Sequence, residues 1–425
     1  FITMCYDGNL MFNLGDPINV SIENFYGIEI NDFAVSVAAT ALWIAESQMW
    51  HETENLIQFD GEFLPLKTNN NIHNNNAFDI NWNDVVPANN LNYIIGNPPF
   101  IGARYMSEAQ KIDKFKVFGG GWKHLGSLDY VCCWLYKSLQ FMYLNKDMRA
   151  AIVATNSVCQ GEQVPALWTP LFNKGITIDF GYQSFPWESE AKDKAHVHCV
   201  IIGFSAQNDS KIKRLFEGND VSYVDNINGY LQGKPNDTIE SHSRAICKEA
   251  PLMQLGNKAI DDGFLSKYSS AEKDTIISQY PKAVQFFKPC FGADEYLDSR
   301  ERWCLWLKDL APSTYSGIKP IMNAVNKVKE FRQDSKREQT KKFASTPMLF
   351  GEIRQPNSTY LVVPLVNTEK RVYIPMDFFE SDIIPTHQLG VIQNASLYHF
   401  GVLQSIIHMA WMRFVCGRQE MRTRY

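Results

Sequence analysis

Residues 91–102 read LNYIIGNPPFIG, an apolar run that ends at two consecutive prolines held between an asparagine and a phenylalanine. Short apolar runs of this kind alternate with helical patterns over the first 205 residues. Continuous apolar strands separated by helices are typical of a mostly parallel sheet with both faces covered. The sequence therefore predicts a doubly wound α/β domain in which the NPPF segment follows one strand.

The other elements expected in this domain follow the same alternation. We expect helices over residues 32–50 and 127–144, because Ala, Leu, Ile and Trp recur there at helical spacing. Further strands are expected at 25–30, 150–155, 176–182 and 196–205.

The composition changes after about residue 208. Gly, Asn and Asp become frequent, and a helical stretch, a basic run and two alternating strands follow. We expect three parts: the α/β domain over residues 1–207, an α+β domain over 208–387, and a helical segment over 388–425.

Composition also limits the class of protein. No apolar run approaches the roughly 18 residues that cross a bilayer, no leader precedes the first strand, and the nine cysteines form no CxxC pair. These features predict a reduced, soluble, cytoplasmic protein without a membrane partner. The net charge is −5, but residues 319–342 hold eight basic and three acidic side chains, so the rest carries −10.

The NPPF segment has chemistry suited to an amino group. Pro98 and Pro99 supply no N–H and fix φ, so their loop is stiff and its carbonyls are free to face a ligand. Asn97 adds an acceptor and Phe100 a flat apolar ring. Two acceptors on an exocyclic amine favour a pyramidal nitrogen that can attack a methyl sulfonium, while the base stacks on the ring. The alternative is that the prolines only end a strand.

This segment resembles motif IV, [DNS]PP[YFW], of the Rossmann-like DNA methyltransferases that modify adenine N6 with S-adenosylmethionine. The resemblance extends to the order of the other motifs. It implies that Asn97, Pro98, Pro99 and Phe100 are catalytic, and that double-stranded DNA is bound with an adenine flipped out of the helix.

The same resemblance implies a set of cofactor-binding residues. Glu29 stands at the end of the second strand, where a carboxylate can accept both hydroxyl hydrogens of the cofactor ribose. Asn76 replaces an acid found near the cofactor adenine in relatives, and Phe78 is expected to contact the cofactor beside it. Asp79 is the alternative polar group there.

Several segments together resemble a narrower family, the MmeI-like enzymes, in which a nuclease, an adenine methylase and a target-recognition domain share one polypeptide. The resemblance covers nearly the whole chain. The segments that carry it are GIEINDFAVSVAATALWIAE, IIGNPPFIGA, ATNSVCQGEQV, RWCLWL, TPMLFGEIRQP, EKRVYIP and HMAWMRFVCGR.

The departures from this family are also informative. The sequence opens at Phe1 without Met, and it has neither the Gly-rich loop that brings backbone amides to the cofactor nor the nuclease motif. The resemblance therefore implies a Rossmann-like methyltransferase sheet that is incomplete at its N-terminus, followed by an α+β target-recognition domain. We expect this chain to be inactive alone.

Basic residues after position 326 suit DNA phosphates. A solvated helix face is the alternative, but Asp334 and Glu338 are a like-charged pair in it. The expected phosphate contacts are Lys327, Lys329, Arg332, Lys336 and Arg337.

Base reading is expected from another segment. In relatives an ExR pattern reads bases, and Glu369 and Arg371 match it on an expected strand that brings Tyr373 to the same face. Arg can read guanine and Glu can accept from cytosine. A solvated turn is the alternative, and Arg354 on the preceding strand is a weaker candidate.

Three further residues are candidates for a role in the site. Trp187 is expected near the flipped base, with core packing as the alternative. His196 and His198 share a strand face, but no third ligand is near, so no metal site is expected.

Two other functions remain open. An NPP loop also suits a protein-glutamine or RNA methyltransferase, and a chain without cofactor binding could be a DNA-binding specificity module without catalysis.

Overall fold

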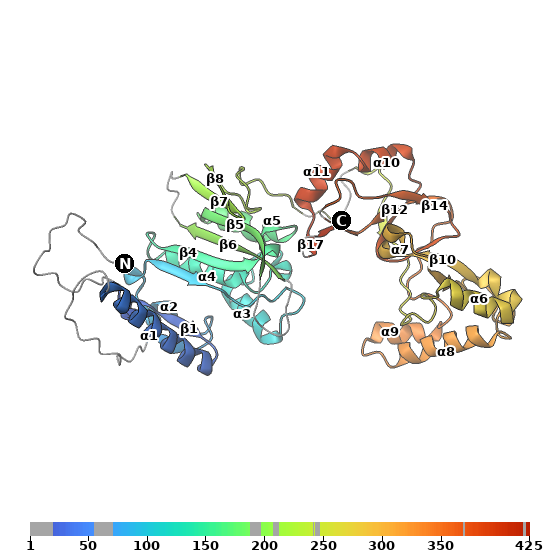
Figure 1. Ribbon diagram of the computed structural model, residues 1–425, viewed down its shortest axis with the longest axis horizontal. Helices are drawn as coiled ribbons and strands as arrows, with labels where there is room; N and C mark the ends of the chain where they lie inside the picture. Colours follow the sequence, from blue (N-terminus) through green and yellow to red (C-terminus); the bar gives the residue numbers. More distant parts are fainter. Residues whose placement is uncertain are drawn as a thin grey trace, which may run out of the picture. The chain divides into compact units, whose positions relative to one another are not determined.

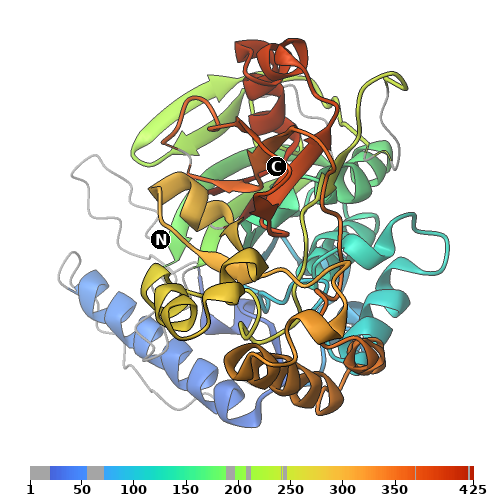
Figure 2. The same ribbon diagram turned by 90° about the vertical axis from the view of Figure 1, so that its right-hand side faces the viewer.

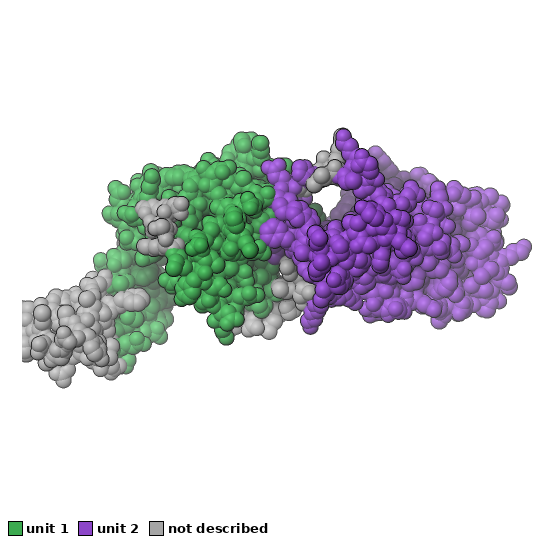
Figure 3. All heavy atoms as spheres, turned by 90° about the horizontal axis from the view of Figure 1, so that it is seen from above, with its two compact units in different colours: residues 1–159, 163–238 green, residues 160–162, 239–425 purple. Residues whose placement is uncertain are grey.

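The computed structural model describes residues 20–54, 71–187, 197–206, 212–240, 242, 247–368, 370–419 and 422–425. The chain forms two compact units, one of residues 1–159 and 163–238 and the other of residues 160–162 and 239–425 (Figure 3). The boundaries expected at 207/208 and 387/388 stay predictions.

Unit 1 is built on a six-stranded sheet (Figure 1). Its order is β3 (Tyr93–Gly96), β4 (Arg149–Thr155), β6 (Val197–Ser205), β5 (Thr177–Trp187), β7 (Lys213–Glu217) and β8 (Asp220–Val224). The strand pairs β3–β4 and β5–β7 are parallel, whereas β6 runs antiparallel to both β4 and β5.

The sheet is therefore mixed, and the expectation of a mostly parallel sheet is wrong in this half of the domain. The physical reason is the short connection between β5 and β6. Only nine residues separate Trp187 from Val197, and a parallel crossover needs about a dozen or more. Neighbouring strands joined by so short a segment must run in opposite directions.

Helices cover one face of this sheet and close the core of unit 1. Alternate residues of β4 are buried, as the two-residue period of a strand requires. Ala150, Ile152 and Ala154 share one apolar cluster with residues of α4 (Cys132–Met142) and α5 (Gln163–Asn173). The helix expected at 127–144 is this α4, shortened at both ends. The third helix on the cluster is α3 (Glu108–Phe118).

A smaller parallel sheet precedes the large one. The strands β1 (Gly27–Glu29) and β2 (Ile72–Asn74) pair with each other, and α1 (Asp32–Glu54) follows β1. The short helix α2 (Trp82–Val85) leads towards β3, and the buried Trp82 joins this region to the core of the unit. The strand and helix expected at 25–30 and 32–50 are therefore present as β1 and α1.

Unit 2 is an α+β domain with several small sheets (Figures 1 and 2). Its central sheet is antiparallel, and β12 (Tyr360–Pro364) is wholly buried within it. The strands beside β12 are β14 (Asp377–Phe379) and β16 (Leu389–Gln393), and β9 (Met253–Leu255) pairs with β16. Two three-stranded sheets lie beside it: β10 (Phe287–Phe291) with β11 (Trp303–Leu305) and β15 (Ile384–Pro385), and β13 (Val366–Asn367) with β17 (Arg418–Gln419) and β18 (Arg422–Arg424).

Six helices complete the described part of unit 2. They are α6 (Ser270–Gln279), α7 (Ala293–Asp298), α8 (Lys319–Gln333), α9 (Glu338–Lys342), α10 (Leu397–Leu403) and α11 (Ile406–Val415). The apolar segment expected as one helix near the C-terminus is two, because Ser405 caps α11 by accepting a hydrogen bond from the N–H of His408. Within the described residues, no helix is both long and apolar enough for a membrane span.

Candidate active site

The NPPF loop begins where β3 ends. Gly96 pairs with Ile152 of β4, so the loop starts from a fixed edge of the sheet. Pro98 is buried, whereas Asn97 and Pro99 are exposed on either side of it and Phe100 is half-buried. The buried proline ring anchors the loop and leaves the Asn97 amide facing solvent. An exposed amide on a loop stiffened by prolines can present an acceptor oxygen to a ligand.

An aromatic partner stands beside this loop. The rings of Phe100 and Trp187 lie with their centroids 6.0 Å apart and their planes at 90°. Trp187 is the last residue of β5 and pairs there with Val197. The order of strands in the sheet thus brings Trp187 to the NPPF tetrapeptide. The sequence alone left both a role in the site and core packing open for this residue.

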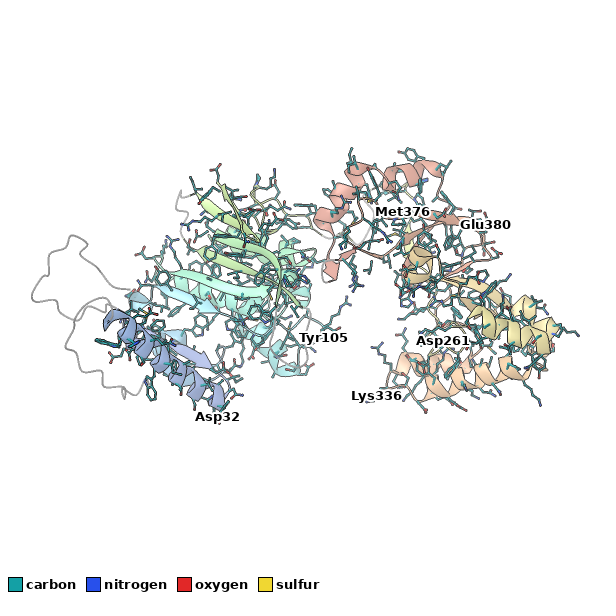
Figure 4. The ribbon with its side chains drawn as sticks, in the orientation of Figure 1. Asp32, Tyr105, Asp261, Lys336, Met376 and Glu380 are labelled. Carbon is teal, nitrogen blue, oxygen red and sulfur yellow. The ribbon has the colours of Figure 1, made fainter. Side chains whose placement is uncertain are left out.

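Hydrogen bonds from the segment just before α4 hold the residues that follow the tetrapeptide. Asp129 accepts a hydrogen bond from the N–H of Ala103 at 2.8 Å, and the N–H of Tyr130 donates to the carbonyl of Ile101 at 2.9 Å. Nothing local in the sequence singles out Asp129, because its partners lie 26 or more residues away. Tyr105, 86% exposed, also projects from unit 1 just after this loop (Figure 4).

Glu29 lies where the sequence places it, at the end of β1. The side chain is half-buried, and one carboxylate oxygen accepts a hydrogen bond from the N–H of Asn31 at 2.8 Å. The backbone carbonyl of Glu29 accepts from the N–H of Asn75. The carboxylate therefore keeps acceptor capacity beyond its contact with Asn31, and its ribose contact stays a prediction.

The other expected cofactor ligands make contacts within the protein. Asn76 accepts from the N–H of Phe78 at 3.1 Å and donates to Asp113 at 3.1 Å. Asp79 forms an ion pair with Lys116 at 2.6 Å. This hydrogen bond lowers the pKa of Asp79 and raises the pKa of Lys116. Any ligand at these two positions would have to share or displace those partners.

Phe78 is a core residue. Only 8% of it is exposed, and its ring contacts Trp134 edge-on with the centroids 4.4 Å apart. The apolar cluster of unit 1 takes in most of this ring, and the expected contact of Phe78 with the cofactor stays a prediction. An aromatic ring buried among other rings gains more from burial than from a solvent-facing position.

Four of the five expected phosphate contacts are exposed. They are Lys327 and Lys329 on α8, and Lys336 and Arg337 in the connection to α9. Lys336 projects from this connection at one end of the pair of helices (Figure 4). Their side chains are accessible to a polyanion.

Arg332 corrects the fifth expectation. It is wholly buried, on the same stripe of α8 as Ile321, Val325 and Val328. Its guanidinium donates five hydrogen bonds, with donor–acceptor distances of 2.8–3.1 Å, to the carbonyls of Ala259, Ile260, Phe343, Thr346 and Leu349. All five guanidinium N–H groups are thus used inside the protein, and Arg332 cannot contact a phosphate.

The expected base-reading strand is also absent. Residues 370–373 form a turn and bend between β13 and β14, because the N–H of Arg371 donates back to the carbonyl of Thr368. Arg413 of α11 binds the carbonyls of Arg371 and Val372, so a side chain takes acceptors that a strand would give to a neighbour. Without a strand, the argument that alternation places residues 369, 371 and 373 on one face fails.

The remaining candidates differ in accessibility. Arg371 is half-buried and Tyr373 is 46% exposed, whereas Glu369 lies outside the described residues. Arg354 is half-buried, pairs with Glu352 and donates to the carbonyl of Gly256. Base contacts by these residues stay predictions.

The histidine pair is only partly described. His198 lies in β6, and His196 lies outside the described residues. Over the ranges that the structure describes, no group of three His, Cys, Asp or Glu side chains is placed to hold a metal ion.

The two parts of the chain match two known classes of domain. Residues 7–217 match the DNA-methyltransferase domain of MmeI, and residues 233–425 match the MmeI target recognition domain. The chain belongs to the MmeI family, and it contains the methyltransferase domain and the target recognition domain of that family.

Two known proteins are similar over nearly all of the chain. DNA methyltransferase A of Bacillus subtilis (strain 168) is 36% identical over 410 residues, which are 96% of this chain and 46% of that protein. The Type IIL restriction-modification enzyme MmeI, in its structure in complex with DNA, is 36% identical in sequence to this chain. The two structures match with a TM-score of 0.91 over 99% of this chain and 56% of that one. The chain thus spans about half the length of these relatives.

Proposed function

We propose that this chain carries the catalytic loop and the recognition domain of a site-specific DNA adenine-N6 methyltransferase. One observation carries the proposal: the exposed amide of Asn97 stands beside the buried Pro98 at the end of β3, next to the Phe100–Trp187 ring pair. Family membership supports DNA as the substrate, since the DNA-bound MmeI structure is similar throughout.

The loop residues have distinct roles in this reaction. The side-chain oxygen of Asn97 and the carbonyl of Pro98 accept the two hydrogens of the adenine amino group, which leaves the nitrogen lone pair directed at the methyl donor. The rings of Phe100 and Trp187 contact the flipped base from one side. The loop is stiff because of its prolines, so it needs little rearrangement when the base arrives.

Residues of this chain fit part of the methyl donor, S-adenosylmethionine. Glu29 suits the ribose diol, because its carboxylate ends a strand and uses one oxygen for Asn31. Asn76 and Asp79 fit less well, since both are paired within the protein. When bound, the donor supplies a methyl group on a sulfonium.

Open strand edges fit the expected Rossmann-like sheet, which is incomplete within the described residues. Within the described residues β1 pairs only with β2, and β3 pairs only with β4. Tyr93 and Ile95 of β3 are 71% and 78% exposed, and no residue of α1 from 32 to 52 is buried. Large apolar side chains at an unpaired edge usually mark a surface that another element covers. Both edges are therefore available for pairing with a further strand.

Labelled S-adenosylmethionine tests the function and separates the alternatives. The chain is compared with a longer form that also contains the Gly-rich cofactor loop expected of the family, which is called the full-length protein below. Each is incubated with plasmid DNA, RNA and a protein extract. We expect transfer to DNA by the full-length protein only. Transfer to RNA or protein instead of DNA would support the second methyltransferase class, and tight DNA binding without any transfer would support a specificity module.

The exposed basic residues predict a salt-dependent contribution to DNA binding. Replacing Lys336 by Ala should weaken binding of the full-length protein to all sequences and reduce the slope of log K against log salt by about 1, the value for one phosphate contact. Lys282→Ala is the matched control, because Lys282 is an exposed lysine elsewhere in unit 2. Fluorescence anisotropy at several salt concentrations measures both. Equal slopes for the two variants would remove Lys336 from the DNA interface.

A further inference from the structure

We propose that Asp129 is a positioning residue that holds the NPPF loop in its reactive geometry. The inference rests on the proposed function of the loop and adds a residue that the family resemblance did not supply. Asp129 contacts neither base nor cofactor in this scheme. It acts through the main chain that follows Phe100.

The carboxylate of Asp129 is buried, and both of its oxygens accept hydrogen bonds. Only 8% of the residue is exposed. One oxygen accepts from the N–H of Ala103 at 2.8 Å, and the other accepts from the Ser157 hydroxyl at 2.6 Å and the Gln163 amide at 2.8 Å. A buried carboxylate with three donors keeps its charge satisfied without water, and charge-assisted hydrogen bonds are the strong ones.

Two adjacent residues, Asp129 and Tyr130, fix the main chain of the loop at two points. Besides the Asp129–Ala103 contact, the N–H of Tyr130 donates to the carbonyl of Ile101 at 2.9 Å. The prolines explain why these contacts are made after Phe100. Pro98 and Pro99 have no N–H to donate, so the main chain must be fixed through the residues that come after them.

The partners of Asp129 tie this loop to its neighbour in the sheet. Ser157 lies in the turn that directly follows β4, and its hydroxyl is also 2.9 Å from that of Thr155, the last residue of β4. Because β3 and β4 are parallel, the loops that follow them emerge at the same edge of the sheet. Asp129 therefore joins the two loops, and Gln163 closes the arrangement by accepting from the N–H of Asp129 at 3.2 Å.

The substitutions Asp129→Ala and Asp129→Asn test this role in the full-length protein. We expect single-turnover methyl transfer by the Ala variant to fall about 10–100-fold, because a displacement of about 1 Å at a reacting group has effects of this size. The KM values for DNA and S-adenosylmethionine should change less than about threefold. The Asn variant should retain more activity, since its amide oxygen can still accept from Ala103.

A matched control is available in the same sheet. Asp179 accepts from Arg149 at 3.1 Å and from Lys213 at 3.3 Å, so Asp179→Asn also removes a carboxylate charge with two partners. Arg149 begins β4 and Thr155 ends it, which places this cluster at the opposite edge from the loop. Methyl transfer by this control should stay within about twofold of the wild type, on the expectation that distant sites act independently.

Hydrogen exchange on the present chain gives a second readout that needs no activity. Peptides that contain residues 100–103 should exchange faster in Asp129→Ala and Asp129→Asn than in the wild type, and should not change in Asp179→Asn. Unchanged exchange in both Asp129 variants would overturn the inference. Faster exchange with undiminished methyl transfer would also overturn it, because the loop would be loosened without catalytic loss. Absence of DNA methylation by the wild-type full-length protein would instead defeat the proposed function and leave the exchange result to decide what Asp129 holds.

Discussion

Replacing Asn97 by Ala in the full-length protein is expected to reduce the rate of methyl transfer to DNA by about 10²–10³-fold, the effect of losing one preorganised hydrogen-bond partner in a transition state. The amide is exposed at the end of β3 and ready to accept from the adenine amino group. Single-turnover assays with labelled S-adenosylmethionine measure the rate. Asn97→Asp should retain part of it, because the carboxylate keeps an acceptor oxygen in place.

Asn92→Ala is the control for this loss. Asn92 is also an exposed asparagine and stands just before β3, at the other end of the strand. Its substitution should leave methyl transfer unchanged. DNA affinity should be similar in all three variants, since Asn97 is assigned to the transferring step. If Asn97→Ala transferred methyl groups as fast as Asn92→Ala, the loop would not be the catalytic site.

Replacing Arg332 by Met is expected to destabilise unit 2 by about 3–5 kcal/mol, because five buried carbonyls would lose their donor and each unsatisfied group is costly. Met retains apolar volume on the buried stripe of α8, so the main loss is in hydrogen bonds. Native-state hydrogen exchange of amides in α8 measures the free energy of opening in the present chain.

Lys329→Met is the control for Arg332→Met. Lys329 lies one turn earlier on α8 and is exposed, so its substitution should change the opening free energy by less than about 0.5 kcal/mol. The comparison also decides between the two interpretations of Arg332. If Arg332 bound a phosphate, the substitution Arg332→Met would lower DNA affinity and leave the stability of α8 unchanged. That result would contradict the buried role.

The sequence contained a signal for the burial of Arg332 that its charge concealed. Positions 321, 325, 328 and 332 recur at helical spacing, and the first three are apolar. This pattern places the arginine on the inward face of the helix. A buried arginine is stable here because carbonyls from residues 259–260 and 343–349 accept its hydrogen bonds. No local sequence pattern could reveal these partners.

The segment 369–375 shows the opposite limit. The run of Val372, Tyr373 and Ile374 has the β-branched and aromatic side chains of a strand, yet residues 370–373 form a turn and bend. The competing contact comes from Arg413, 42 residues along the chain from Arg371. Strand formation needs a neighbouring strand as well as a suitable pattern, and a side chain from α11 occupies the carbonyls instead.

The sequence by itself determined the features that depend on neighbouring residues: β3 ending in a proline-stiffened loop, Glu29 closing β1, the change of architecture after the first domain, and family membership. Only the tertiary structure decided what meets that loop. Trp187 reaches Phe100 through the order of strands in the sheet, and Asp129 reaches Ala103 across 26 residues. Such contacts depend on strand order, register and burial, which arise from the whole packed chain, so short sequence patterns cannot specify them.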